Sequence, residues 1–210
     1  MTKCGDNSYP SDCEVMAGYR AMAINQTGEK AKYPEPLLAK AEQIRLLLLD
    51  VDGVLTDGTL LYSENGHEIK PFNTQDGFGL RILQDAGIAA GIITARKSEI
   101  VARRARELGL QHLYQGIAGK LTAFKDISAK SGLKPFEIAY MGDDWLDLPL
   151  LGRVGLALAP ANGVAEVKQA AHFITQNSGG AGAVREACEL ILRAKGIYDT
   201  ILQKYQNFTG

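Results

Sequence analysis

The sequence predicts an α/β fold, with a doubly wound (Rossmann-like) parallel sheet and helices on both of its faces. Short runs of almost wholly apolar residues recur along the chain, and runs of this length suit strands that are buried on both faces. Helical patterns separate these runs, and strands that alternate with helices are typical of a covered parallel sheet. The predicted strands lie at residues 44–49, 88–94, 138–142 and 155–159.

Each predicted helix has apolar residues three and four positions apart, which places them along one face. Three of these stripes are followed by a glycine, Gly87, Gly109 or Gly132, at the position where helices commonly end. A shorter helix is predicted at residues 36–43. The stripes lie at residues 79–86, 101–108, 121–127 and 184–192.

One segment breaks the alternation of strands and helices. Residues 58–63 and 67–72 are predicted to form two strands around Asn65-Gly66, a pair favoured in tight turns because both residues tolerate positive φ. We therefore expect a small β-hairpin at 58–72 in place of a cap domain. Residues 37–210 are predicted to form one domain, preceded by a flexible segment at 1–36 that lacks periodicity.

The composition argues against several classes of protein. Hydrophobic residues make up 46% and charged residues 22%, and the formal net charge is −1, so the basic excess of a nucleic-acid-binding surface is missing. We expect no membrane span and no signal peptide, because no long apolar run is present. Cys4, Cys13 and Cys188 are too scattered for a disulfide framework or a metal site, and a reducing cytoplasm is the predicted location.

Polar side chains follow three of the predicted strands. Asp50, Thr94 and Asp143 fall at or just after strand ends, and in this architecture ligands bind where the carboxyl ends of the strands meet. Asp50 and Asp52 stand two residues apart in a turn that Gly53 eases. Two buried carboxylates this close repel one another unless a cation lies between them, so they indicate a metal site.

Three more acidic or basic positions fit the same site. Asp143, Asp144 and Asp147 are typical of a site for a hard cation, although a negatively charged helix N-terminus accounts for Asp144 and Asp147 equally. The hydroxyl of Thr94 is suited to bind a phosphoryl oxygen, and a Thr at a strand end also commonly serves as the N-cap of the next helix. Lys120 begins a helical pattern, where it either neutralises developing negative charge or lies in solvent. The order of these residues along the chain favours a common site.

These residues resemble the four ordered motifs of the haloacid dehalogenase superfamily of phosphotransferases. The motifs are matched by Asp50/Asp52, Thr94, Lys120 and Asp143/Asp144, and the resemblance covers about residues 44–193. Further segments are similar to the 3-deoxy-D-manno-octulosonate 8-phosphate phosphatase family, whose members have a minimal cap and form tetramers. These segments are residues 44–58, 72–77, 93–97, 112–116 and 182–186.

The resemblance implies a function. Members of the family release phosphate from the sugar acid 8-phosphate, a small-molecule substrate, on the way to lipopolysaccharide. Asp50 is then the nucleophile and Asp52 the general acid and base, while Thr94 and Lys120 act on the phosphoryl group. Asp50, Asp52 and Asp143 hold Mg²⁺, and Asp144 and Asp147 orient waters or Lys120. The implied substrate-binding residues are Asp52, Asn73, Thr74, Gln75, Asp76, Gly77, Arg81, Arg96, Arg104 and Lys120.

Three alternatives remain open at this point. Close relatives of the family act on nine-carbon sialic-type sugar acid 9-phosphates, and others serve as tetramerising modules of activating enzymes. A phosphoacceptor receiver domain also combines acidic residues, Thr and Lys on such a sheet, but normally places its phosphorylated Asp after the third strand. Family members often carry Arg where this chain has Ala181, which bears on one substrate contact.

Overall fold

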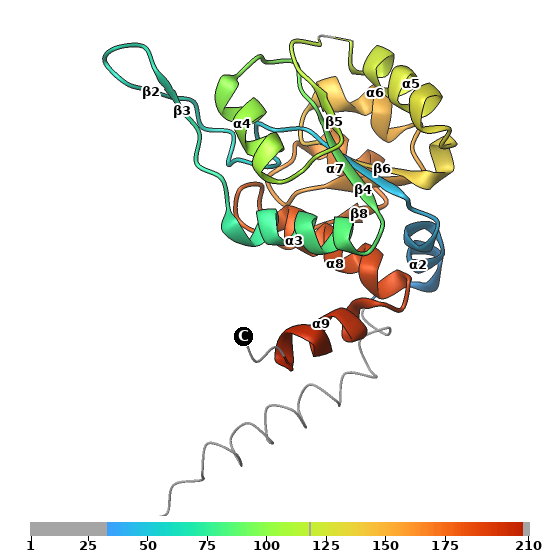
Figure 1. Cartoon of the computed structure of the whole chain (residues 1–210). Coiled ribbons are helices and arrows are strands. Elements are labelled where there is room, and N and C mark those ends of the chain that lie inside the picture. Colours follow the sequence, from blue (N-terminus) through green and yellow to red (C-terminus); the bar gives the residue numbers. More distant parts are fainter. Residues whose placement is uncertain (1–32, 118, 208–210) are drawn as a thin grey trace, which may run out of the picture. The chain divides into compact units, whose positions relative to one another are not determined.

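The computed structural model describes residues 33–117 and 119–207 (Figure 1), and the body considered below begins at Glu35. Among these residues, six strands form one parallel sheet. They are β1 (Leu46–Leu49), β4 (Ala89–Ile93), β5 (His112–Tyr114), β6 (Ile138–Met141), β7 (Leu156–Ala159) and β8 (Phe173–Ile174). Their order in the sheet is β5-β4-β1-β6-β7-β8, and every neighbouring pair is parallel. The α/β fold predicted from the sequence is confirmed.

The four predicted strands are the four central ones. The chain enters β1 between β4 and β6, with Leu46 paired to both Ala89 and Ile138, and all four residues of β1 are buried. The two outer strands, β5 and β8, were not predicted. They have three and two residues, and their side chains are only partly buried or exposed, so no continuous apolar run announces them.

The helices follow the predicted stripes. These are α3 (Thr74–Asp85), α4 (Glu99–Glu107), α5 (Lys120–Ser131) and α8 (Ala183–Ala194), and α2 (Glu35–Glu42) lies within one residue of its prediction. Gly87, Gly109 and Gly132 follow α3, α4 and α5 with positive φ, as the glycine signal predicts. Three further helices were not predicted because they are short or bury little surface: α6 (Leu148–Leu151), α7 (Ala165–Ala170) and α9 (Tyr198–Gln206).

The helices cover both faces of the sheet. On one face, α5, α6 and α7 pack over a core that includes Leu48, Phe124, Tyr140 and Leu150. On the other face, α3 and α8 lie side by side and α2 packs against α8 (Figure 1). The strands are therefore removed from water on both sides, which stabilises the sheet and leaves the ends of the strands as the accessible edge.

The predicted hairpin is present but shorter than expected. It consists of β2 (Leu61–Tyr62) and β3 (Glu68–Ile69), an antiparallel pair that projects from the rest of the body (Figure 1). Of the pair Asn65-Gly66, only Gly66 adopts a positive φ (76°). The turn is wider, because the Ser63 N–H donates to the His67 carbonyl (2.9 Å) and the Gly66 N–H donates to the Ser63 carbonyl (2.9 Å).

In the part of the chain that the structure describes, no helix has the length and apolarity needed to cross a membrane. Most of the predicted flexible segment, residues 1–32, lies outside the described residues, as do Cys4 and Cys13. The division at residue 36 therefore stays a prediction, as does the single domain at 37–210.

Candidate active site

Asp50 continues β1 into the site. Its N–H donates to the Met141 carbonyl of β6 (3.0 Å), so the residue is fixed at the carboxyl edge of the sheet. The chain then turns tightly, with the N–H groups of Leu55 and Thr56 donating to the Val51 carbonyl (2.9 and 3.0 Å). The Val51 N–H donates back to Asp50 Oδ1 (2.7 Å). The other carboxylate oxygen of Asp50, Oδ2, faces Lys120.

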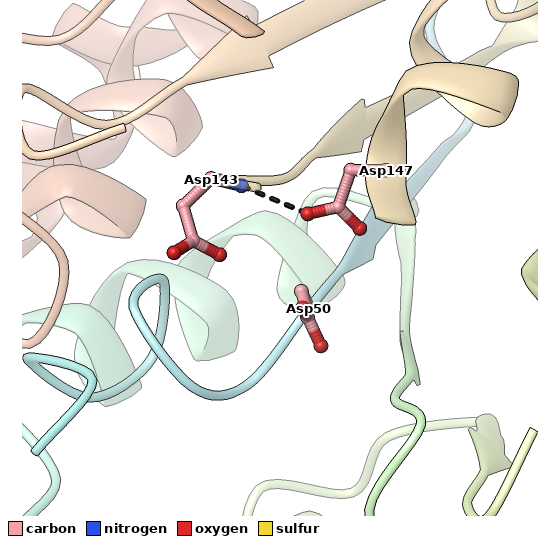
Figure 2. Close-up of side chains that lie close together, drawn as sticks. All are labelled: Asp50, Asp143 and Asp147. Carbon is pink, nitrogen blue, oxygen red and sulfur yellow. Dashed lines mark hydrogen bonds between the residues drawn. The ribbon is translucent and has the colours of Figure 1, made fainter. Parts of the chain in front are cut away.

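Asp143 and Asp147 enter the same place from the loop after β6 (Figure 2). Asp147 is fully buried, and its Oδ2 accepts the backbone N–H groups of Asp143 (2.9 Å) and Asp144 (3.2 Å). Gly142 is required here, because a Cβ at this position would collide with the side chain of Asp147. The loop is therefore folded around Asp147, and this holds Asp143 at the edge of the sheet.

Gly53 explains how Asp143 and the Asp50 loop approach so closely. Its φ is +86°, a region that residues with a side chain rarely adopt. A Cβ at this position would also collide with the Asp143 carboxylate. Glycine therefore serves two purposes in the Asp-x-Asp-Gly turn, since it permits the turn and makes room for a carboxylate from another loop.

Lys120 joins two of the three carboxylates. Its Nζ lies 2.7 Å from Asp50 Oδ2 and 2.5 Å from Asp147 Oδ1, and only 1% of its side chain is exposed. The Tyr140 hydroxyl, on β6, accepts from the same Nζ (3.1 Å) and donates to Asp147 Oδ1 (2.5 Å). A buried ammonium held by two carboxylates and a phenol is charged and closely fixed in place.

The electrostatics indicate a cluster with too much negative charge. Burial raises the pKa of Asp50 to about 6, against the opposing effect of Lys120. Burial, followed by the charges of Asp50 and Asp147, raises the pKa of Asp143 to about 7. Burial by itself lowers the pKa of Lys120, but Asp50 and Asp147 outweigh it and the pKa is raised. One lysine does not compensate three carboxylates.

The cluster fits a divalent metal ion. Asp50, Asp143 and Asp147 each place a carboxylate oxygen within 4.8 Å of the others. Among the described residues, Asp143 Oδ1 is buried without a hydrogen-bond partner, which is costly unless a ligand satisfies it. Asp147 is a weaker candidate, because both its oxygens are already engaged by Lys120, Tyr140 and two N–H groups. The all-oxygen donor set suits a hard cation such as Mg²⁺.

Asp52 lies next to the cluster, among cations. Its Oδ1 is paired with Lys70 Nζ and its Oδ2 lies 3.6 Å from Arg96 Nε. Lys70 follows β3, so the hairpin contributes a buried ammonium to the turn that carries Asp52. Thr94 is also buried at the end of β4, where its hydroxyl accepts the Arg96 N–H (3.3 Å). Arg96 therefore contacts Asp52 through its side chain and Thr94 through its backbone N–H.

Four further predicted residues lie at the start of α3 or in the loop after β6. Asn73 caps α3, accepting the N–H groups of Gln75 (2.7 Å) and Asp76 (3.3 Å), and its amide donates to the Gly180 carbonyl (3.3 Å). Thr74 and Gln75 are exposed in the first turn of α3. Asp144 is exposed and accepts the Trp145 N–H (2.7 Å).

Asp76 connects α3 to the start of α8. It is buried, and its oxygens accept the N–H groups of Gly182 (3.3 Å) and Arg185 (2.8 Å) at the start of α8. Burial raises the pKa of Asp76, against the effect of these hydrogen bonds. A carboxylate occupied in this way holds two helices together, and its contact with substrate stays a prediction.

The predicted arginines are not all near the cluster. The Arg104 guanidinium lies over Gly77, where a Cβ would collide with it, and 5.8 Å from the centre of the Phe72 ring. It also pairs with Glu107 (3.5 Å). Arg81 is exposed on α3, and no hydrogen bond or ion pair joins it to another described residue. Among the three arginines, only Arg96 contacts Asp52.

The comparisons with known proteins decide the family. Residues 112–186 match the model of the haloacid dehalogenase-like hydrolases. The 3-deoxy-D-manno-octulosonate 8-phosphate phosphatase KdsC of Escherichia coli strain K12 is 47% identical over 163 residues, which cover 78% of this chain and 87% of the relative. The chain belongs to this phosphatase family. The predicted family and enzyme class, a phosphoric monoester hydrolase, are thereby confirmed.

Solved structures agree with this assignment. A probable YrbI family phosphatase from Pseudomonas syringae pv. phaseolica superposes with a TM-score of 0.82 at 45% identity, covering 83% of this chain and 99% of its own. The 3-deoxy-D-manno-octulosonate 8-phosphate phosphatase of Moraxella catarrhalis, in complex with a magnesium ion, a phosphate ion and KDO, has a TM-score of 0.81 at 41% identity. It covers 83% of this chain and 100% of its own.

Several residues of the phosphatase site were not predicted. Tyr140 reads as an ordinary core residue of an apolar strand, and Lys70 and Glu68 read as surface positions of a hairpin. Asn162 lies in a loop, where its amide donates to the Gly53 carbonyl (2.9 Å) and its oxygen accepts the Gly179 N–H (2.6 Å). The loop with Gly179 and exposed Ala181 is thereby fixed against the catalytic turn. A buried Tyr in a strand next to an Asp motif was the one available signal.

Removing the Tyr140 hydroxyl is expected to slow the phosphatase without unfolding it. Tyr140→Phe leaves Lys120 as the remaining side-chain partner of Asp147 Oδ1, so Lys120 is held less firmly beside Asp50. We expect kcat to fall about tenfold, and stability to fall by about 1–2 kcal/mol because a buried hydrogen bond is lost. Steady-state kinetics and thermal unfolding measure the two effects.

Tyr114→Phe on β5 is the matched control, because the Tyr114 hydroxyl donates to Asp126, at the surface and outside the cluster. It is expected to leave kcat unchanged. An unchanged kcat in Tyr140→Phe would contradict the positioning role.

Proposed function

We propose that the protein hydrolyses 3-deoxy-D-manno-octulosonate 8-phosphate, through an aspartyl-phosphate formed on Asp50, in lipopolysaccharide precursor synthesis. The observation that carries the proposal is the meeting of Asp50, Lys120 and Asp143 at the carboxyl edge of the sheet, in a member of this phosphatase family. The receiver alternative is set aside, because the chain belongs to a family of hydrolases.

The proposed nucleophile, which attacks the phosphorus atom, is Asp50. One of its oxygens is fixed by the Val51 N–H and the other faces Lys120, so the carboxylate is oriented before substrate arrives. Attack forms the Asp50–phosphate bond as the bond to the sugar oxygen breaks. Lys120 and the Thr94 hydroxyl bind the phosphoryl oxygens, where negative charge is concentrated.

The proposed general acid and base is Asp52. In the first step it gives a proton to the departing sugar oxygen, and in the second it takes one from the water that attacks the aspartyl-phosphate. Arg96 and Lys70 beside it provide positive charge for an anionic substrate. A sugar acid phosphate carries a phosphate and a carboxylate, and a guanidinium is well suited to either.

The residues that would hold Mg²⁺ are Asp50 and Asp143 through their carboxylates and Asp52 through its backbone carbonyl. When bound, the ion supplies charge neutralisation between the Asp50 carboxylate and the incoming phosphate. Asp147 instead holds Lys120 and the loop that carries Asp143. Asn73, Thr74, Gln75, Asp76, Gly77, Arg81 and Arg104 stay proposed substrate contacts.

The test is phosphate release with Mg²⁺ from the eight-carbon and nine-carbon 3-deoxy sugar acid phosphates, with p-nitrophenyl phosphate as a generic substrate. Preference for the eight-carbon compound, lost on chelation, is the expected result. Preference for the nine-carbon compound would move the pathway to sialic-type sugars and retain the mechanism. If none of the three compounds is hydrolysed in a metal-dependent way, the proposed phosphatase activity is refuted and a tetramerising module is favoured.

We further propose a homotetramer located in the cytoplasm. The hairpin supports the oligomer, because Leu60, Leu61, Tyr62 and Ile69 are large apolar residues that are exposed on a small projecting element. Contact with neighbouring subunits would cover these side chains. Sedimentation analysis of the full chain tests the tetramer, and Leu61→Glu is expected to weaken it.

Mg²⁺ is expected to stabilise the protein more as the pH rises. The pKa values of Asp50 and Asp143 in the folded metal-free protein are about 6 and about 7, and the ordinary value is 3.8. Between about pH 4 and pH 7 the folded state therefore binds more protons than the unfolded state, and stability falls as pH rises through this window. The penalty is fully present above about pH 7.

Metal binding replaces these protons and removes the penalty. The increase in Tm caused by Mg²⁺, relative to chelated protein, is expected to be small near pH 5 and large near pH 8. Asp143→Asn should lose most of this increase at both values. A Tm increase that does not depend on pH would contradict the assignment.

A further inference from the structure

A network of charged side chains lies at the base of the hairpin, outside the carboxylate cluster. Tyr62 on β2 and Glu68 on β3 are directly opposite across the two strands, which places both side chains on one face. Both contact the same nitrogen of Arg96: Nη2 donates to Tyr62 Oη (3.1 Å) and to Glu68 Oε1 (2.8 Å). Lys70, two residues after Glu68, lies 3.3 Å from the same oxygen.

The Glu68 carboxylate is occupied on both sides. Arg96 and Lys70 share Oε1, and Oε2 accepts the hydroxyl of Ser98 (2.7 Å), the residue that precedes α4. Burial alone raises the pKa of Glu68, but the Ser98 hydroxyl and the Lys70 ammonium outweigh it and the pKa is lowered. Glu68 therefore joins the hairpin to the start of α4.

The same two cations flank Asp52. Lys70 pairs with one oxygen of Asp52 and Arg96 approaches the other, while only 2% of the Lys70 side chain is exposed. Two carboxylates, Asp52 and Glu68, thus share two cations. If Glu68 were neutral, both cations would face Asp52 alone, and in a partly buried site their attraction would draw its carboxylate toward them.

We propose that Glu68 is a positioning residue for Asp52, which keeps Arg96 and Lys70 in place beside Asp52 and leaves that carboxylate directed at the leaving group. This inference deepens the proposed function, on which it rests, because it concerns the departure of the sugar oxygen. It also gives the hairpin a part in the reaction, since Glu68, Lys70 and Tyr62 all belong to that element.

The test uses two substrates that differ in their need for a proton. An alkoxide leaving from a sugar needs one, whereas p-nitrophenolate leaves as a stable anion. In Glu68→Gln, kcat/KM for the sugar acid phosphate is expected to fall about tenfold or more, because positioned proton transfer contributes factors of this size or larger. For p-nitrophenyl phosphate, kcat/KM is expected to change by less than about threefold. This parameter reports the steps up to loss of the alcohol.

Glu64→Gln is the matched control, because it removes the same charge from the exposed turn of the same hairpin, and is expected to leave both values unchanged. Ser98→Ala, which removes a partner of Glu68 without contacting Asp52, should show the same selectivity to a smaller degree. Equal losses on both substrates in Glu68→Gln, or no loss on either, would overturn the inference. Failure of the unmodified protein to hydrolyse the sugar acid phosphate would instead count against the proposed function.

Discussion

Asp50→Asn is expected to lower phosphate release from every substrate by at least about 10⁴-fold, as removal of a nucleophile does in other covalent hydrolases. The amide keeps the size and shape of the carboxylate but cannot form the phosphoryl bond. The Asp50 charge itself is unfavourable in the folded metal-free protein, since burial raises its pKa to about 6. We therefore expect the Tm of the chelated variant to equal or exceed that of the unmodified protein.

Two measurements separate loss of chemistry from loss of fold. Phosphate release is followed at saturating substrate and Mg²⁺, and thermal unfolding is followed in chelator. Asp85→Asn, which removes an exposed carboxylate at the end of α3, is the control and should leave both unchanged. Residual turnover within about tenfold of normal would show that another group attacks phosphorus.

Lys120→Met is expected to reduce both activity and stability. The ammonium lies between Asp50 and Asp147, with 1% of its side chain exposed. Its removal leaves two buried carboxylates without their cation, which typically costs about 3–5 kcal/mol of unfolding free energy. Loss of a positioned cation from the phosphoryl site lowers kcat by about 10²–10³-fold.

The pH profile distinguishes this role from simple packing. Lys120 lowers the pKa of Asp50 against the effect of burial, so without it the pKa should rise above about 6. The acidic limb of the kcat/KM profile is therefore expected to move to higher pH in Lys120→Met. Lys125→Met, on the exposed face of the same helix, is the control. An unchanged profile would indicate that Lys120 does not act on Asp50.

Local patterns were enough to locate the centre of the fold and of the site. The four central strands are continuous apolar runs because both faces of each are buried, and the glycines after α3, α4 and α5 mark helix ends by their positive φ. Asp50, Thr94 and Asp143 fall at strand ends, and the carboxyl ends of parallel strands must meet. Lys120 was placed with them by the order of the motifs.

The turn and the outer strands show the limit of such patterns. Asn65-Gly66 is a strong hairpin signal, yet the turn formed is wider and Asn65 keeps a negative φ. β5 and β8 are short edge strands, which exist because a neighbouring strand offers hydrogen-bonding groups. Neither depends on a run of residues that a local pattern can detect.

The sequence by itself thus determined the fold class, the family and the residues that meet at the edge of the sheet. Only the tertiary structure decided the partners of each charged group. In the folded protein, Asp76 accepts a hydrogen bond from the start of α8, and Asp147 and Tyr140 bind Lys120. Glu68 pairs with the two cations beside Asp52. The physical reason is that a carboxylate accepts hydrogen bonds from the donors that lie within about 3 Å of it. Those donors come from segments that are far apart along the chain.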